Sequence, residues 1–450
     1  MSKYIYSLKN YRAIKQADIA IDGITVLAGE NGCGKSTLSR WLYYTINGSA
    51  DFEKLLFQEY VASLKNFVSK WEFVNRDIRR NSMLDSKSGQ PSSKKITAEL
   101  FDQLLVLDKF NTEDIERAQM IFFQTLDVFA ELLHNYLNEE SREIRKNRIL
   151  NFLDIKLDEY STVKDAINAF VRKYERLFEL RTSNLYSCLH ERRIKDFSRI
   201  ISNKFVERDS FPVQLQLRED GLDLLDNGCL ATIYNLHKAF YVDTPMAITS
   251  SGFDNYFWNE LKGIMVSPSL MNIPRSAKLL VKRIKNLIGG EAKLVKDDTF
   301  DELHELRYVS EDNEIDIELF KAATGIKTFI YLQRLLQNGC LTDSTLLLID
   351  EPEAHLHPQW IVEYARLLVL INKNLGTKIM IASHNPDMVA AIRSIAEREN
   401  SLDRTHFYLA EKLEGGHQYV YQNLGHEIGE IFRSFNIALD RIKQYGTDSI

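Results

Sequence analysis

The sequence predicts an α/β fold in which a mixed sheet carries a mid-sized α-helical insertion. A short, β-branched stretch, Ile24–Ala28, precedes a glycine-rich loop and then apolar residues at helical spacing. Four consecutive aliphatic residues, Leu346–Ile349, predict a buried strand late in the chain. Between them, from Asp51 to about Lys204, long charged stretches carry apolar residues three and four positions apart, as helices do.

Length and composition indicate a large core and more than one folded unit. The 450 residues suggest two or three units, and we expect boundaries at 1–50, 51–204 and 205–450. Charged residues make up 27% of the chain, and its formal charge of −6 gives no global attraction to nucleic acid. The sequence shows no signal peptide and no run of about 18 apolar residues, so we expect a cytoplasmic protein and no membrane contact. The cysteines show neither metal spacing nor a disulfide framework, and we expect buried free thiols outside the glycine loop.

The first elements are predicted to be strands that lead into the glycine loop. Apolar residues alternate over Tyr4–Leu8 and over Ala17–Ile21, with the stretch Asn10–Lys15 between them, which predicts two strands and a turn. After the loop, the helical pattern that begins at Leu38 is expected to stop at Asn47-Gly48.

The loop Gly29–Thr37 fits the pattern G-x-x-x-x-G-K-[ST]. Its glycines allow backbone N–H groups to close around an anion, and the start of the next helix adds a partial positive charge. Lys35 is expected to reach the β- and γ-phosphates, and the Ser36 hydroxyl to bind Mg²⁺. A chance glycine-rich turn would not have a strand before it and a helix after it, so a nucleoside triphosphate site is predicted. Its expected contact residues are Gly29, Asn31, Gly32, Cys33, Gly34, Lys35, Ser36 and Thr37.

The helical region is predicted to contain the helices Phe52–Val74, Glu113–Leu153 and Val163–Ser183. The polar segment Asn81–Lys95 is expected to be an exposed loop. Basic clusters at 76–80, 142–148 and 190–195 contain interspersed acids, which favours solvated helix faces over a nucleic-acid or partner surface.

Strand patterns return after Phe205. They predict strands at Val213–Leu217, Tyr241–Pro245, His406–Ala410 and Gln418–Gln422, and a hairpin at 305–318. A basic helix is predicted at Ala277–Leu287. A further helix is predicted to begin at Ala323-Thr324-Gly325-Ile326-Lys327, where a small polar residue and a glycine could form an anion seat. Taken alone, this stretch is better explained by a plain helix cap.

Two predicted strands end in residues suited to phosphate chemistry. The strand Leu346–Ile349 delivers Asp350 and Glu351 to its carboxyl end, where ligands of α/β sheets bind. Asp350 is expected to hold Mg²⁺ through water, and Glu351 to accept a proton from the attacking water. The strand Lys378–Ser383 ends at His384, a residue able to bond the γ-phosphate and sense its loss. Lys35, Glu351 and His384 are therefore the predicted catalytic residues.

Together these motifs resemble those of ABC-type ATPases of the SMC, RecF and OLD (overcoming lysogenization defect) group. Gly29–Thr37 resembles Walker A, Leu346–Glu351 resembles Walker B, and His384 resembles the switch histidine. The segments Asn10–Arg12 and Glu353–Pro358 also resemble segments of that group. The resemblance covers residues 1–50 and 290–400, and it implies an ABC-type P-loop NTPase core with a mixed sheet and an antiparallel β subdomain. It further implies ATP and Mg²⁺ as ligands, and a homodimer or higher even oligomer in which two chains sandwich two ATP molecules.

By the same resemblance, Thr324 and Gly325 belong to the signature that caps ATP bound to a second protomer. This signature reads ATGIK, so Lys327 replaces a neutral side chain of the family, and a lysine near phosphate is physically reasonable. For the glutamine of the family's Q-loop, the sequence leaves Gln58, Gln103 and Gln124 as candidates.

The resemblance extends to stand-alone ATPase subunits of bacterial anti-phage systems of the Septu (PtuA-like) type, which work with a separate HNH nuclease. No acid cluster with metal spacing follows His384 in the sequence, so an effector in another chain is expected. Two alternatives remain at this stage: a RecF- or SMC-like factor that repairs or organises DNA, and an ATP-binding scaffold with little turnover. The first requires the basic helix faces to gather into one stripe, and the second requires turnover that hardly depends on Glu351.

Overall fold

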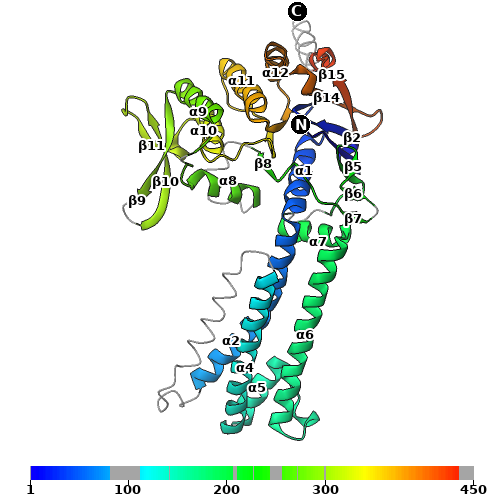
Figure 1. The fold of residues 1–450 in the computed structure, drawn as a ribbon, viewed down its shortest axis with the longest axis vertical. Helices are drawn as coiled ribbons and strands as arrows, with labels where there is room; N and C mark the ends of the chain where they lie inside the picture. The colour runs from blue at the N-terminus through cyan, green and yellow to red at the C-terminus, as the bar shows by residue number, and fades with distance from the viewer. Residues whose placement is uncertain are drawn as a thin grey trace, which may run out of the picture. The chain divides into compact units, whose positions relative to one another are not determined.

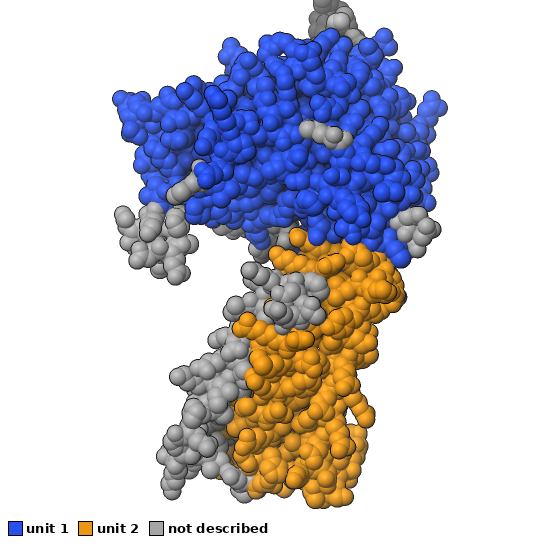
Figure 2. All heavy atoms as spheres, viewed as in Figure 1, with its two compact units in different colours: residues 1–50, 194–450 blue, residues 51–193 orange. Residues whose placement is uncertain are grey.

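The computed structural model describes residues 2–81, 112–140, 142–205, 210–226, 228–243, 256–270, 272–297 and 300–434. These residues form two compact units, which are coloured separately in Figure 2. Unit 1 contains the described parts of Met1–Ala50 and Ile194–Ile450, and unit 2 those of Asp51–Arg193. The division falls at residue 193 rather than at the expected 204, because the helix α7 (Ile194–Lys204) packs against α1 (Lys35–Ala50) of unit 1.

A sheet of ten strands, counted over the described residues, forms the centre of unit 1 in the order β5-β4-β1-β2-β15-β14-β3-β13-β12-β8. The strands β14, β3, β13, β12 and β8 run parallel to one another. Three of them are buried at every residue, as their continuous aliphatic sequences predict: β3 (Ile24–Ala28), β12 (Thr345–Asp350) and β13 (Lys378–Ser383). The other two are β8 (Lys238–Val242) at the edge and β14 (Thr405–Lys412).

The other half of the sheet is largely antiparallel. The strand β1 (Tyr4–Tyr11) pairs with β2 (Ile14–Ile21) and with β4 (Leu215–Glu219), which pairs in turn with β5 (Leu222–Asp223). The strand β15 (Tyr419–Gly425) is antiparallel to β14 and parallel to β2. The alternating apolar residues of β1 and β2 are fully buried, as predicted. The predicted α/β fold with a mixed sheet and an antiparallel part is therefore confirmed.

Helices pack on the parallel strands. The helix α1 packs on β8, β12 and β13, and α11 (Pro358–Leu375) packs on β13 and on α12 (Pro386–Arg398). The prediction that α1 stops at Asn47-Gly48 is wrong, because the helix continues to Ala50. A side chain at Gly48 would place its Cβ only 2.2 Å from the Cδ1 atom of Ile201. Gly48 therefore serves the close packing of α1 on α7, and this contact outweighs the low helix propensity of glycine.

A second group of elements gathers at the side of unit 1 away from β2 and β5 (Figure 1). It contains the three-stranded antiparallel sheet β11-β10-β9 and three helices. Arg334 of α10 is buried there and donates hydrogen bonds to the carbonyl oxygens of Met265 and Ser267 and to the Ser269 hydroxyl. The elements are α8 (Tyr256–Val266), α9 (Arg275–Ile288), β9 (Gly290–Asp297), β10 (Phe300–Ser310), β11 (Asp316–Glu318) and α10 (Thr324–Gln337). Unit 1 also contains β6 (Leu225–Asp226), β7 (Cys229–Leu230) and the 3₁₀ helices Leu319–Lys321 and Leu402–Arg404.

Unit 2 is helical, as predicted, and is built around aromatic side chains. Trp71 packs against Phe122 and Tyr174, with ring centroids 5.3 and 4.9 Å apart. The stretch Glu113–Leu153, which was predicted to be helical, contains two helices, the first ending at Glu139 and the second beginning at Glu143. The elements are α2 (Phe52–Asn81), α4 (Thr112–Glu139), α5 (Glu143–Leu153), the 3₁₀ helix Leu157–Glu159 and α6 (Val163–Glu191). The predicted loop at 81–95 lies outside the described residues except for its first residue.

The basic clusters of unit 2 carry ion pairs with nearby acids. Arg145 pairs with Glu140 at 3.6 Å, and Arg148 of α5 pairs with Asp77 of α2 at 2.9 Å. Arg192 likewise lies 2.9 Å from Glu53. Interspersed acids thus pair with these arginines; the Arg148 side chain is exposed as expected, whereas the Arg192 side chain is mostly covered and lies over the Phe52 ring.

Two further expectations concern the cysteines and membranes. Cys33 and Cys188 are buried and Cys340 is half-buried, but Cys229 is exposed on β7, so the expectation of buried thiols is wrong for Cys229. In the described parts of the chain, no helix combines the length and apolar character needed to cross a membrane.

Candidate nucleotide site

The register of three parallel strands brings the predicted motifs to one edge of the sheet. Asp350, the last residue of β12, pairs with Ala382 of β13, and the next residue of β13, Ser383, pairs with Ala28 of β3. The chain then continues from Ala28 into the glycine loop, from Asp350 to Glu351, and from Ser383 to His384. Stretches that are far apart in the sequence therefore meet where ligands of parallel sheets usually bind.

The glycine loop turns tightly from β3 into α1. Gly34 has a φ of +99°, and a Cβ at this position would lie 2.7 Å from the Cγ1 atom of Ile14, so only glycine fits without rearrangement. The Lys35 ammonium curls back over the loop and donates hydrogen bonds to the carbonyl oxygens of Gly29 (2.8 Å) and Glu30 (2.9 Å). Cys33 is buried, and its carbonyl accepts a hydrogen bond from the Tyr421 hydroxyl. Asn31, Gly32 and Ser36 are exposed, while Thr37 is half-buried.

Asp350 is a buried carboxyl group surrounded by hydroxyl donors. Its side chain accepts hydrogen bonds from the Ser39 hydroxyl (2.8 Å to Oδ1), from the Tyr241 hydroxyl (2.8 Å to Oδ2) and from Ser36. Only 2% of the residue is exposed. Burial raises the pKa of Asp350 to about 6, although the three hydroxyl groups favour the ionised form. A cation at this position would remove the desolvation penalty of the carboxylate.

Tyr241 connects Asp350 to an ion pair on the surface. Arg40 of α1 donates a hydrogen bond to the Tyr241 hydroxyl (3.4 Å) and pairs with Asp243 at 3.1 Å. The sequence analysis did not identify Ser39 or Tyr241. Ser39 could have been found, because it lies four residues after Lys35 on the same face of α1. No local pattern in the sequence could have identified Tyr241, since only the pairing of β8 with β12 brings it to Asp350.

Two of the three glutamines considered for the Q-loop lie in unit 2. Gln58 lies in α2 and Gln124 in α4, both in unit 2. Gln103 lies outside the described residues.

His384 lies beside two carboxylates. Its Nδ1 atom is 3.5 Å from an oxygen of Glu351 and 3.5 Å from an oxygen of Glu353. The same Glu353 oxygen accepts hydrogen bonds from the Ser383 hydroxyl (2.8 Å) and from the backbone N–H of His384 (3.1 Å). Glu353 is buried, which raises its pKa, whereas the Glu351 side chain is 47% exposed. Glu353 therefore fixes the backbone and the ring of His384, a role that the sequence analysis did not assign to it.

The signature residues lie at the start of α10, and their described contacts are with neighbouring parts of unit 1. A Cβ at Gly325 would lie 2.8 Å from the Cζ3 atom of Trp360, so this glycine permits the close approach of α10 and α11. Lys327 is buried, and its ammonium donates a hydrogen bond to the Phe320 carbonyl at 2.7 Å. Burial lowers the pKa of Lys327. Thr324 is half-buried and accepts a hydrogen bond from Thr328 through its carbonyl. The Lys327 ammonium is thus bonded within its own chain.

The sequence matches the family described as "AAA domain, putative AbiEii toxin, Type IV TA system" over residues 24–390. The chain belongs to this family. The matched range runs from β3 to α12 and so includes the glycine loop, Asp350, Glu351 and His384. The AAA domain family is a family of P-loop ATPases, which agrees with the motifs that meet at the strand edge. No curated protein matches the chain.

Solved structures similar to this AAA domain protein include SMC heads and a transporter ATPase. The Smc head domain with an extended coiled coil, bound to the C-terminal domain of ScpA and derived from Pyrococcus furiosus, has 10% identity and a TM-score of 0.35, and the match covers 98% of this chain and 100% of that chain. The SMC head domain from Thermotoga maritima has 10% identity and a TM-score of 0.37, covering 94% and 99%. The cbiO1 protein from Clostridium perfringens, part of the ABC transporter complex cbiONQ, has 16% identity and a TM-score of 0.26, covering 56% and 82%. Because all three TM-scores are below 0.5, the assignment rests on the family match.

Proposed function

We propose that the chain binds ATP with Mg²⁺ at the edge formed by β3, β13 and β12, and that it hydrolyses the nucleotide. The strand register carries this proposal, because it joins the glycine loop, the acids after β12 and the histidine after β13 at one edge. Hydrolysis at such a site is mostly positioning and charge stabilisation.

The side chains at this edge fit a magnesium nucleotide. The Lys35 ammonium lies on two loop carbonyls, and phosphate oxygens can compete for the same hydrogen-bond donors. The Ser36 hydroxyl and the Asp350 carboxylate are the hard oxygen donors that Mg²⁺ prefers. When bound, Mg²⁺ supplies positive charge that stabilises the phosphate oxygens during transfer to water.

Two further residues are assigned to the water and the γ-phosphate. Glu351 follows β12 directly and its side chain is partly exposed, so we assign to it the acceptance of a proton from the attacking water. His384 is assigned to the γ-phosphate. Its Nδ1 side faces Glu351 and Glu353, so the Nε2 atom is the one left to meet a ligand.

We further propose that the nucleotide state gates an effector on a separate chain, such as an HNH nuclease, in anti-phage defence. In this scheme two chains sandwich two ATP molecules, and Thr324 and Gly325 of one chain face the ATP of the other. The resemblance to anti-phage ATPase subunits supports the scheme, as does the family description, which names a toxin of a Type IV TA system. Because Lys327 is bound to the Phe320 carbonyl, we assign the contact with phosphate to Thr324 and the backbone of Gly325.

The variant Glu351→Gln tests the proposal. We expect it to bind ATP, to lose phosphate release and to accumulate as an ATP-bound dimer, measured by steady-state turnover and by light scattering after gel filtration. Glu414→Gln, an exposed substitution of the same kind in the β14–β15 turn, should behave like the wild type. Wild-type turnover in Glu351→Gln would refute the assigned role of Glu351. A wild-type chain that binds ATP but shows neither turnover nor a dimer would favour the scaffold alternative.

A DNA-organising role is the second candidate, and it is compatible with the family. The ion pairs of Arg145, Arg148 and Arg192 neutralise part of the basic clusters that such a role would use, so we rank it below effector gating. Binding of a DNA duplex that falls steeply with salt would reverse this order.

A further inference from the structure

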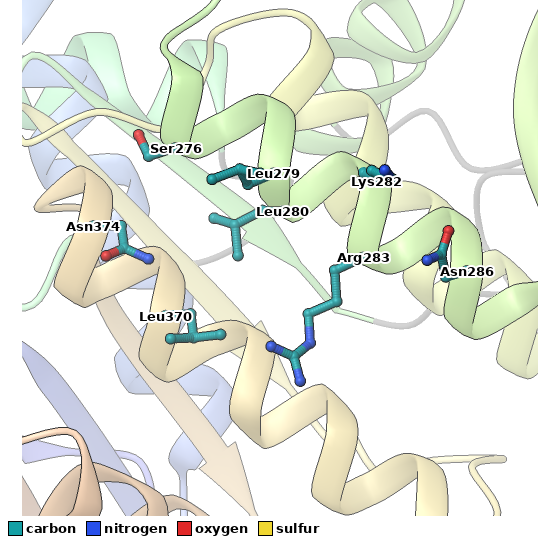
Figure 3. A pocket seen from close by; sticks show the side chains of 8 residues that line it. All are labelled: Ser276, Leu279, Leu280, Lys282, Arg283, Asn286, Leu370 and Asn374. Atoms are coloured by element: carbon teal, nitrogen blue, oxygen red, sulfur yellow. The ribbon is translucent and has the colours of Figure 1, made fainter.

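A groove between α9 and α11 lies apart from the nucleotide site (Figure 3). Its volume is about 490 Å³. Leu279 and Leu280 of α9 face Leu370 of α11 across it, and Ser276 and Asn374 lie together at one end. Leu279 is 61% exposed, whereas Leu280 is buried in the floor. The centre of the groove is therefore apolar and open to a partner.

The helix that forms one wall of the groove carries only positive charges. Five basic residues and no acid occupy α9, although the whole chain has a formal charge of −6. Arg283 pairs with Glu363 of α11, and Lys285 pairs with Glu291. Arg275, Lys278 and Lys282 are exposed and make no ion pair with any residue that the structure describes. Of these three residues, Lys282 lines the groove, which thus combines an exposed leucine with a cation that the described residues leave unpaired.

We propose that this groove docks an acidic, amphipathic α-helix of a separate protein partner. Apolar side chains of that helix would cover Leu279 and Leu370, and a carboxylate of it would meet Lys282. Helices commonly bind grooves between two helices through a few apolar anchors. A nucleic acid fits less well, because a phosphate backbone would leave the exposed leucine uncovered. The proposal states what kind of surface the partner in the gating role would present. It rests on the proposed gating role only for the identity of that partner.

The experiment uses the full chain without nucleotide and three fluorescent probes. The first is a helical peptide with leucines on one face and glutamates on the other, the second has lysines in place of the glutamates, and the third is a DNA duplex. Fluorescence anisotropy should show saturable binding of the glutamate peptide only. Leu279→Asp should weaken that binding tenfold or more, whereas Leu222→Asp, at an equally exposed leucine of β5, should not change it. The variant Lys282→Glu should weaken binding of the glutamate peptide and strengthen binding of the lysine peptide.

Several results would overturn the proposal. They are the absence of saturable binding of the glutamate peptide, equal binding by Leu279→Asp, or duplex binding that Leu279→Asp abolishes. A change of oligomeric state in Leu279→Asp, measured by light scattering, would assign the groove to a second copy of this chain instead. ATP turnover of Leu279→Asp is measured in parallel, so that a failure of the docking proposal is distinguished from a failure of the ATPase proposal.

Discussion

The replacement Asp350→Asn should stabilise the nucleotide-free protein above neutral pH. Burial raises the pKa of Asp350 to about 6, compared with 3.8 for an unperturbed aspartate. Between these values the folded protein binds a proton that the unfolded chain has released, so the free energy of unfolding falls as the pH rises. A shift of about two pKa units corresponds to roughly 3 kcal/mol, which is the stability that the ionised carboxylate removes above about pH 7. Asparagine has nearly the same shape without the charge, and its amide can still bond the surrounding hydroxyl groups.

Thermal unfolding of the two proteins at several pH values measures this effect. At about pH 8 the variant should melt roughly 5 °C above the wild type, and below about pH 3 the difference should vanish, because Asp350 is then mostly protonated in both the folded and the unfolded chain. Asp403→Asn, at an exposed aspartate, should show no such dependence on pH. A lower melting temperature for Asp350→Asn at pH 8, or a difference that is the same at both pH values, would refute the reasoning.

The remaining predictions concern turnover. Lys35→Ala should abolish ATP binding or hydrolysis, because it removes the ammonium group of the loop; equal turnover in this variant and in Lys373→Ala, at an exposed lysine of α11, would count against the nucleotide site. Glu353→Gln should lower kcat roughly tenfold with little change in KM for ATP, since it loosens the histidine that the carboxylate holds; an effect on KM alone in steady-state assays would argue against that positioning role. Gly325→Ala should lower the melting temperature and the dimer-dependent turnover without affecting ATP binding by the monomer, because its Cβ would lie 2.8 Å from Trp360. Adding Trp360→Leu should restore the melting temperature, and a dimer that then turns over normally would show that Gly325 acts only through packing.

The sequence could predict those parts that are encoded locally. The strands β3 and β13 have the bounds predicted from the sequence, because a strand buried on both faces needs a largely aliphatic sequence. Asp350, Glu351 and His384 could be selected because each follows a predicted strand and because, together with the glycine loop, they resemble the motif order of ABC-type ATPases. Their meeting at one edge followed from the rule that parallel strands share a carboxyl end.

Other parts depended on contacts between distant residues, which no local pattern contains. The pair Asn47-Gly48 is typical of a helix end, yet Gly48 lies within α1. A side chain at this position would collide with Ile201, so the glycine serves packing instead. The position of Lys327 in the signature-like stretch suggested a contact with phosphate, yet in the structure its ammonium donates a hydrogen bond to the Phe320 carbonyl. The hydrogen bond from Tyr241 to Asp350 exists only because β8 pairs with β12. The sequence by itself determined which strands and which reactive groups this protein has. The tertiary structure decided which of those groups are buried, paired or left free, because burial and hydrogen bonding are properties of the packed chain.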